Sequence, residues 1–171
     1  VSTGSLLQSF LNPNHPGYDY FGSPVALSGN NALIGSYGKN NYSGAAYLYD
    51  VSTGSLLQSF LNPNPPGSDY FGISVALSGN NALIGALGED NYSGAAYLYD
   101  VSTGGLLQSF LNPTPASSDY FGGPVALSGN NALIGALGEN TASGAAYLYA
   151  STSSSPPTQA QSVPGPLPLL G

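Results

Sequence analysis

The chain contains the same 50-residue sequence three times, at residues 1–50, 51–100 and 101–150 of its 171 residues. A period of this length is typical of a repeat architecture, in which each unit buries its apolar side against a neighbouring unit. We therefore expect one repeat domain over residues 1–150 and a separate segment over residues 151–171. The first two copies differ only at His15/Pro65, Tyr18/Ser68, Ser23/Ile73, Pro24/Ser74, Ser36/Ala86, Tyr37/Leu87, Lys39/Glu89 and Asn40/Asp90.

The chain carries very little charge. Charged residues make up 5% of it, against about 25% in a typical soluble domain. Lys39 is its one cation and the formal net charge is -7. Phosphate binding and anionic lipid binding both need clustered Lys and Arg, so we expect neither a nucleic-acid nor a membrane partner. A weakly charged surface repels its own copies little, which favours self-association.

Two further features of composition bound the class of protein. The chain has no Cys, which excludes disulfides and thiolate metal sites. It begins at Val1 and not at Met, which favours a processed form or a fragment.

Each copy contains four short apolar segments separated by turn sequences. In copy one these are Ser5–Leu11, Tyr20–Ser28, Asn31–Ser36 and Ala45–Tyr49. Gly and Pro interrupt any helical periodicity, and the Ser-Gly-Asn-Asn sequence between the second and third segments suits a hairpin because Gly and Asn tolerate positive φ. The pattern predicts an all-β fold with four antiparallel strands per copy.

The junction between copies also reads as a tight turn. In Asp50–Gly54 the Asp can accept hydrogen bonds from the turn amides and the Gly can supply a left-handed residue. We therefore expect the last strand of one copy to pair with the first strand of the next copy.

The segment Phe71–Ala86 reads Phe-Gly, then Val-Ala-Leu-Ser-Gly-Asn, then Ala-Leu-Ile-Gly-Ala. It resembles the FG-GAP type of propeller blade, found in bacterial surface propellers and in integrin heads. Tyr97–Leu107 also resembles the strand-turn-strand of quinoprotein-type blades. The resemblance implies three tandem four-stranded antiparallel propeller-type blades. Closed propellers have about four to eight blades, so we expect three blades to stay open in one chain and to be completed by neighbouring subunits.

FG-GAP blades often carry an Asp-rich calcium-binding loop. The corresponding loops here are residues 38–42 and their equivalents. Calcium takes about six to eight oxygen ligands, several of them from carboxylates. Copy one supplies no carboxylate there and copy three only Glu139. Glu89 and Asp90 remain as a weak candidate pair, a solvated turn is the favoured interpretation, and no cofactor is expected.

The residue inventory argues against catalysis. The one His, His15, is replaced by Pro65 and Pro115 in the other copies. An Asp recurs before each Tyr-Phe-Gly, at Asp19 and its equivalents 69 and 119, and one Asp per copy suits a turn-capping role better than a general acid-base pair. We therefore expect that the protein is not an enzyme.

Two features concern sugars. Asn41 and Asn91 begin Asn-Tyr-Ser sequons on loops that should be exposed, which makes them possible glycosylation sites. The chain is also rich in tyrosines that could stack on sugars, although tyrosines more often serve as strand residues with one wet end; in copy one these are Tyr18, Tyr20, Tyr42, Tyr47 and Tyr49.

After Tyr149 the composition changes to a Ser/Pro-rich linker. Residues 163–171 resemble the opening of the PEP-CTERM sorting signal in its Val-Pro-Gly-Pro form, used by exosortase-bearing bacteria, including cyanobacteria. The resemblance implies export to the cell surface or beyond, whereas by composition alone a disordered Pro-rich end fits equally well. We expect this tail to lie across a joint between subunits as a clasp formed by Val163, Pro164, Leu167, Leu169 and Leu170.

The two ends of the repeat domain are complementary. Ser5–Leu11 has no preceding strand to pair with, and Ala145–Tyr149 has no following one. Bare edges favour pairing between chains, so the sequence predicts an extracellular structural protein that assembles head to tail into a filament or surface layer. The alternative is a fragment of an FG-GAP propeller adhesin that binds glycan or protein. The expected assembly edges are Ser5, Leu7, Ser9, Leu11, Ala145, Tyr147 and Tyr149.

Overall fold

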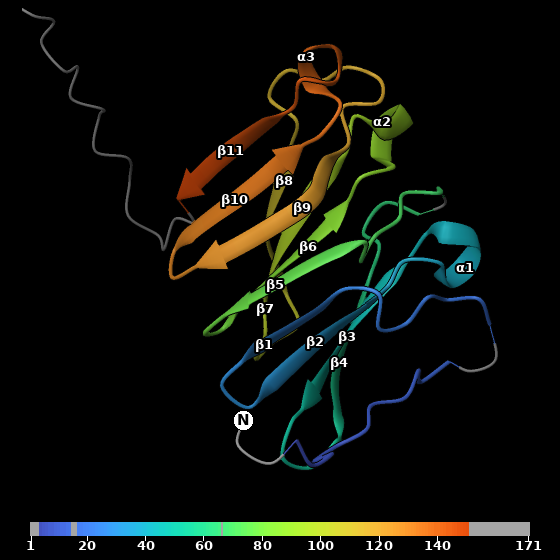
Figure 1. The fold of residues 1–171 in the computed structure, drawn as a ribbon, viewed down its shortest axis with the longest axis vertical. Helices are drawn as coiled ribbons and strands as arrows, with labels where there is room; N and C mark the ends of the chain where they lie inside the picture. The colour runs from blue at the N-terminus through green and yellow to red at the C-terminus, as the bar shows by residue number, and fades with distance from the viewer. Residues whose placement is uncertain (1–3, 15–16, 66, 151–171) are drawn as a thin grey trace, which may run out of the picture.

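Three antiparallel sheets, here called blades one to three, form the computed structural model, which describes residues 4–14, 17–65 and 67–150 (Figure 1). The strands are β1 (Val25–Ser28), β2 (Asn31–Ser36), β3 (Ala45–Asp50) and β4 (Leu56–Leu61) in blade one, β5 (Ser74–Ser78), β6 (Asn81–Ala86), β7 (Ala95–Asp100) and β8 (Leu106–Leu111) in blade two, and β9 (Phe121–Ser128), β10 (Asn131–Ala136) and β11 (Ala145–Ala150) in blade three. No sheet closes on itself within the described residues, and the predicted fold class of open, propeller-type blades is confirmed.

Each complete blade borrows its fourth strand from the next copy. β3 pairs with β4, and β7 pairs with β8, across the junction between copies. At the first junction the Asp50 carboxylate accepts hydrogen bonds from the Thr53 amide at 2.8 Å and from the Ser52 hydroxyl at 2.6 Å, and Gly54 has φ +73°. The predicted hairpin between successive copies is confirmed.

Two strand predictions are wrong in extent. Within the described part of copy one, Ser5–Leu11 forms no strand because no earlier strand lies beside it. The second strand begins at Val25 and not at Tyr20, and Tyr20 itself has a left-handed φ of 54°. The equivalent strand of copy three, β9, begins earlier, at Phe121.

The short segments α1 (Lys39–Tyr42), α2 (Glu89–Tyr92) and α3 (Glu139–Ala142) are single left-handed turns. In α1 the φ angles of Asn40 and Asn41 are 52° and 55°. Asn and Asp visit this region more readily than other non-glycine residues, which suits the Asn and Asp residues at five of the six equivalent positions; the exception is Thr141, with φ 57°. The predicted turn is present, but it is not fully solvated, because Glu89 and Glu139 are buried. It leads from the second strand of each blade to the third.

Both faces of the blades are apolar, and neighbouring blades stack face to face (Figure 1). We call one side the leucine face, after Leu33 and Leu48 and their equivalents, and the other the isoleucine face, after Ile34 and its equivalents. Side chains alternate between the two faces along each strand. The leucine face of blade one packs on the isoleucine face of blade two, and the same contact recurs between blades two and three.

Candidate functional site

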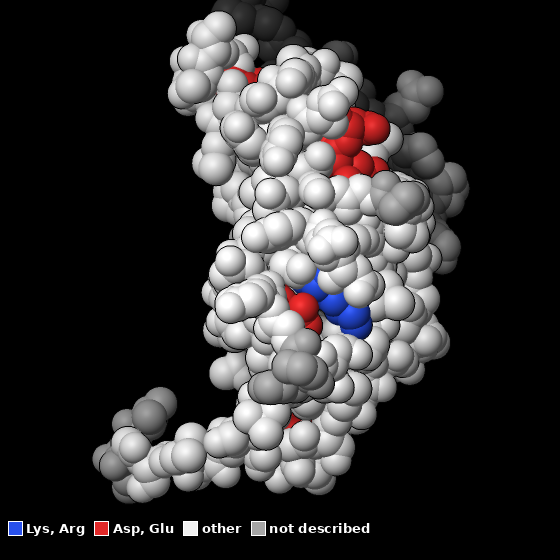
Figure 2. Space-filling model, turned by 90° about the vertical axis from the view of Figure 1, so that its right-hand side faces the viewer, with Lys and Arg blue, Asp and Glu red and all other residues white. Residues whose placement is uncertain are grey.

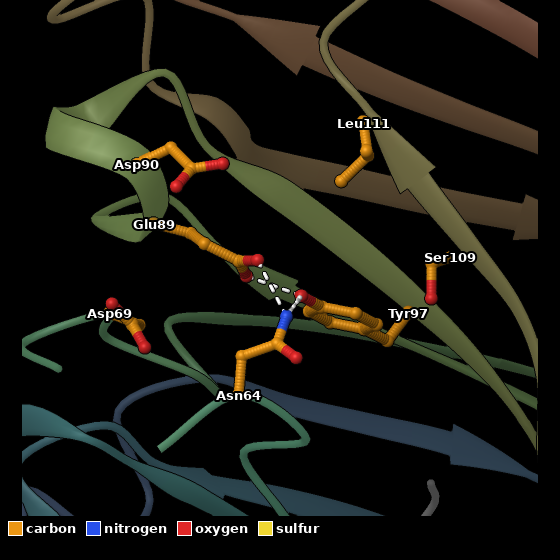
Figure 3. A pocket seen from close by; sticks show the side chains of 7 residues that line it. All are labelled: Asn64, Asp69, Glu89, Asp90, Tyr97, Ser109 and Leu111. Carbon is orange, nitrogen blue, oxygen red and sulfur yellow. Dashed lines mark hydrogen bonds between the residues drawn. The ribbon is translucent and has the colours of Figure 1, made fainter. Parts of the chain in front are cut away.

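A hydrogen-bonded acid-tyrosine cluster lies at the end of blade two (Figure 3). The Asn64 side-chain amide donates to Glu89 Oε1 at 2.8 Å and lies 2.9 Å from the Tyr97 hydroxyl, which donates to Glu89 Oε2. Glu89 comes from α2, Tyr97 from β7 and Asn64 from the loop after β4. Ser109 and Leu111 of β8 line the other side of a cavity of about 550 Å³.

Burial dominates the electrostatics of this cluster. It raises the pKa of the Glu89 carboxyl, although the hydrogen bonds from Tyr97 and Asn64 act in the opposite direction. Burial likewise raises the pKa of Tyr97. Glu89 is 7% exposed and Tyr97 1% exposed, so the pair holds its proton away from solvent.

The same cluster changes its chemistry from copy to copy. In copy one Lys39 takes the place of the Glu, and its Nζ lies 2.8 Å from the Tyr47 hydroxyl. In copy three Thr114 replaces the Asn, and both its hydroxyl and that of Tyr147 bond to Glu139 Oε1. The sequence indicated none of these pairings, since the partners lie 8 and 25 residues apart in copy three.

The candidate calcium ligands are neighbours in α2, but they do not converge on a shared site. The Glu89 carboxylate is buried and bonded to Tyr97 and Asn64, whereas Asp90 is exposed. No group of three or more His, Cys, Asp or Glu residues among those described could hold a metal ion.

The other candidate residues have structural surroundings. The sequon residues Asn41 and Asn91 are exposed in α1 and α2. Asp69 accepts a hydrogen bond from the Asn62 amide at 2.6 Å, and Asp119 accepts one from Asn112 at 2.8 Å, which ties each loop to the strand before it. His15 and the predicted tail clasp lie outside the described residues.

Blade three leaves its leucine face open. Leu33 and Leu83 are fully buried, but the equivalent Leu133 is 44% exposed. Leu148 is 70% exposed, whereas its equivalents in blades one and two are 0% and 3% exposed. β11 pairs with β10 alone among the described strands, so its outer edge is free of strand partners there.

Blade one leaves part of the opposite face open, although Ile34 and Tyr47 on that face are buried beneath Phe10 and Phe21. Val25 and Leu27 on its isoleucine face are 66% and 72% exposed. The stretch Gly4–Leu11 runs along this end, held by a Phe10–Tyr49 ring contact at 5.2 Å and by the Tyr49 hydroxyl, which donates to the Leu11 carbonyl at 2.8 Å. The equivalent ring pairs, Phe60–Tyr99 and Phe110–Tyr149, lie at 4.9 Å.

The predicted edge residues therefore fall at opposite ends of the molecule, Ser5, Leu7, Ser9 and Leu11 in the N-terminal stretch and Ala145, Tyr147 and Tyr149 in β11. The sequence analysis missed the exposed leucines Leu133 and Leu148. Their signal was available, because strands that are apolar at successive positions are typical of sheets covered on both faces.

Tyrosines also form a continuous row along one side of the blades. Their ring centroids lie 5.0–6.3 Å apart from one neighbour to the next. Figure 2 shows that the side carrying the turns has one basic spot and a few acidic ones on an otherwise uncharged surface. The members of the row are Tyr20, Tyr37, Tyr42, Tyr70, Tyr92 and Tyr120.

A match to a model of a protein family shows which known proteins this chain is related to. The FG-GAP repeat model matches residues 8–49, 60–99 and 111–149, which together make up most of the chain. The chain belongs to the FG-GAP repeat family. The matched ranges agree with the three copies in the sequence.

Solved structures support the fold of this FG-GAP chain. The computationally designed Ika4 protein matches with a TM-score of 0.56 and 19% identity over 86% of this chain and 73% of its own. A europium-containing methanol dehydrogenase matches with a TM-score of 0.54 and 14% identity over 78% of this chain but only 24% of its own. A search of curated proteins gave no significant match.

The Phe-Gly pair that gives FG-GAP repeats their name has a physical role here. Phe71 is fully buried between blades one and two, and its backbone bridges to Gly44. Gly72 has φ +88°, and a Cβ there would lie 2.2 Å from the Ala45 carbonyl oxygen. The pair thus places a large ring in the core at a point where the two backbones come too close for any side chain.

Proposed function

We propose that this FG-GAP chain is a non-catalytic structural protein that assembles head to tail through contacts like those between its own blades. FG-GAP repeats are typical of extracellular or surface proteins, and we place the assembly there. No helix in the described part of the chain is long and apolar enough to span a membrane. The supporting observation is that one end exposes Leu133 and Leu148 of the leucine face and the other exposes Val25 and Leu27 of the isoleucine face, parts of the two surfaces that the chain buries against each other twice.

The N-terminal stretch of a second copy fits the free edge of β11 by sequence and register. Leu6–Leu11 is identical in sequence to β4 and β8, and Ala145–Tyr149 is identical to the first five residues of β3 and β7. Within the chain, Ala45 pairs with Leu61 and Tyr47 with Ser59. The same register between copies pairs Ala145 with Leu11 and Tyr147 with Ser9, which supplies backbone hydrogen bonds by strand addition.

The energies are of the size that association requires. Fully burying an exposed Leu or Val side chain contributes about 1.5–3 kcal/mol, so the four side chains of the open faces, which are 44–72% exposed, contribute on the order of 4–8 kcal/mol. Association costs about 4–15 kcal/mol in lost freedom of motion. Face burial alone is therefore marginal, and the added strand is the contact that makes the joint stable.

The geometry of the joint decides the product. A head-to-tail contact that does not close yields a filament, and one that closes yields a ring such as a six-bladed dimer. The predicted tail clasp would lie across this joint.

The test compares two Leu-to-Glu variants of the full chain by analytical ultracentrifugation and cryo-electron microscopy. Leu148→Glu places a charge on the open leucine face. Leu107→Glu places the same charge on β8, at a position that stays 56% exposed and whose equivalent Leu57 is still 47% exposed beside the next blade. We expect the wild type and Leu107→Glu to form concentration-dependent polymers and Leu148→Glu to stay monomeric.

Wild-type monomers at every concentration, or equal assembly of the two variants, would refute the proposal. Refutation of the first kind leaves the second candidate, a fragment of an FG-GAP adhesin. The tyrosine row favours that candidate, because exposed aromatic rings can stack on sugars. A glycan array probed with the monomeric protein tests it directly, and loss of binding in Tyr92→Ala would assign the row.

A further inference from the structure

The left-handed turns of blades one and three share a backbone and differ in their side chains. Asn41 and Tyr42 have φ angles of 55° and 68°, and the equivalent Thr141 and Ala142 have φ angles of 57° and 67°. The turn therefore forms without an amide or an aromatic ring at these two positions. The Asn and the Tyr of blade one are not required by the fold, so we looked for another role for them.

The differences between copies one and two gather around the same turn. Residues that vary on a constant scaffold are typical of recognition surfaces, because loops carry binding groups while the strands hold them in place. Four of the eight differences between these copies lie in α1, directly before it, or in the loop that contacts it, with Tyr18, Tyr37, Lys39 and Asn40 in copy one and Ser68, Leu87, Glu89 and Asp90 in copy two.

The tyrosine row is densest at this turn. The Tyr20 and Tyr37 rings stack with centroids 5.0 Å apart and planes 2° from parallel. The Tyr42 ring lies 6.3 Å from that of Tyr20 and 5.1 Å from that of Tyr70, which belongs to the next copy. Tyr18, Tyr20 and Tyr42 are exposed. Exposed tyrosines offer an apolar ring together with a polar hydroxyl, so this part of the row suits a ligand with both kinds of surface.

Two cavities at the turn are lined by the amides of Asn40 and Asn41. One has a volume of about 410 Å³ and also contacts Tyr18 and Tyr42, and the other has a volume of about 390 Å³ and also contacts Ser68. Ligand sites in proteins commonly have volumes of about 300–1,000 Å³. A side-chain amide both donates and accepts hydrogen bonds, which matches the hydroxyl groups of a sugar.

The two cavities carry little charge. Asp19 is the one charged residue among the described residues that line them, and its carboxylate accepts a hydrogen bond from the Asn12 amide at 2.9 Å. The net charge of -7 disfavours an acidic ligand. In blade two the position of Asn40 is held by the exposed Asp90. The turn of blade one is therefore the better match for an uncharged ligand.

We propose that the turn side of blade one binds an uncharged oligosaccharide, with tyrosine rings stacked on the sugars and the amides of Asn40 and Asn41 bonded to sugar hydroxyls. The proposal deepens the second candidate function, rests on the same tyrosine row and does not depend on assembly. Because the row continues from Tyr42 to Tyr70 in the next blade, the ligand spans more than one sugar unit.

The experiment titrates dilute full-length protein, of an intact mass equal to that of the bare chain, with neutral oligomers of glucose and of N-acetylglucosamine. An oligomer of a uronic acid is the charged comparison. The chain has no Trp, so its intrinsic fluorescence reports on tyrosines. We expect the wild type to bind a neutral oligomer and not the acidic one.

The variants use residues that the chain itself accepts in the same backbone. Tyr42→Ala and Asn41→Thr copy the turn of blade three, and each should weaken binding by about tenfold, the loss expected for one stacking contact or one set of hydrogen bonds. The matched control, Tyr92→Ala, removes the equivalent ring of blade two and should change the affinity by less than about twofold. Circular dichroism checks that all three variants fold like the wild type.

A gain of binding provides the second test. Changing Ser68→Tyr, Leu87→Tyr and Asp90→Asn together gives blade two the exposed residues of blade one. Calorimetry should then count two sites per chain in place of one. An unchanged count would show that these residues do not make the site.

The outcomes separate this proposal from the others. Binding that Tyr92→Ala abolishes and Tyr42→Ala leaves intact would overturn the site in blade one and leave the adhesin candidate standing. Preference for the acidic oligomer would overturn the uncharged ligand class, and failure to bind either neutral oligomer would overturn the site itself. Sedimentation of the same protein at high concentration reads head-to-tail assembly independently of all these results.

Discussion

At the scale of single residues, glycines set how closely the blades approach. Gly94 has φ +87°, and a Cβ there would lie 2.0 Å from the Phe121 carbonyl oxygen in the next blade. Gly79, in a hairpin turn, has φ +55° but no atom within 4 Å of its Cβ position. Both glycines have a positive φ, but only Gly94 has a neighbouring backbone in contact with its Cβ position.

We predict that Gly94→Ala lowers the free energy of unfolding by at least about 3 kcal/mol, because a blade must shift in addition to the left-handed strain of about 1–2 kcal/mol. Gly79→Ala should cost only that strain, about 1 kcal/mol. Urea unfolding of both variants measures the difference. Equal losses would show that the contact between the blades is not as tight as the structure has it.

The aspartates at the junctions between copies make the stability of the fold depend on pH. The hydrogen bond from the Ser52 hydroxyl, followed by that from the Thr53 amide, lowers the pKa of Asp50 to about 2. An unfolded Asp titrates near about 3.9. The stability that Asp50 contributes is therefore present above pH of about 4 and is lost as the pH falls toward 2.

We predict that Asp50→Asn reduces the dependence of the melting temperature on pH in this acid range. Thermal unfolding followed by circular dichroism from pH 2 to pH 6 measures the effect against the wild type. An unchanged pH dependence in the variant would mean that the turn does not prefer the charged carboxylate.

At the scale of elements, one sequence adopts two conformations. Leu-Leu-Gln-Ser-Phe-Leu is a strand as β4 and β8, but residues 6–11 are not, although the three segments are identical. The difference is the availability of a partner edge, since β propensity reflects cross-strand packing more than an intrinsic backbone preference.

We predict that Phe60→Ala, which removes a ring that is 2% exposed, destabilises the chain by about 3–5 kcal/mol. The equivalent Phe10→Ala should destabilise the monomer by less than about 2 kcal/mol, because its segment has no strand to lose, yet it should weaken assembly. Chemical unfolding of dilute monomer and sedimentation of concentrated protein read the two effects. Equal destabilisation by the two changes would place residues 6–11 in a strand.

At the scale of the whole molecule, the two ends of the chain expose surfaces that are complementary to each other, and neither surface is complementary to itself. A permuted chain tests this. This chain starts at Asn12 and keeps the natural sequence to Tyr149. The sequence of residues 50–61 then replaces residues 150–171, so that the fourth strand of blade three is part of the same chain.

We predict that this permuted chain assembles at least about tenfold more weakly than the wild type, a change of about 1.4 kcal/mol, because face stacking remains but no strand is exchanged. Its monomer should melt at a higher temperature. Sedimentation and calorimetry measure these properties, and unaltered assembly would rule out strand exchange as the basis of the joint.

Much of this fold could be predicted from the sequence, because its signals are local. The alternation of apolar segments with Ser-Gly-Asn-Asn turns predicts hairpins, and the Asp50–Gly54 turn correctly links strands of successive copies. The candidate cluster could not be predicted, because Asn64, Glu89 and Tyr97 meet only when three loops and strands are stacked.

The sequence by itself determined the repeat, the all-β class and the borrowing of a strand across each junction, since these depend on contacts between chain neighbours. Only the tertiary structure decided that, among the described residues, residues 6–11 have no strand partner and one oxygen of Glu139 has no hydrogen-bond donor, and that Leu148 is exposed while Leu48 is buried. These properties depend on which blade, if any, packs against the residue. Identical sequences cannot carry that information, because burial is set by the neighbour and not by the residue.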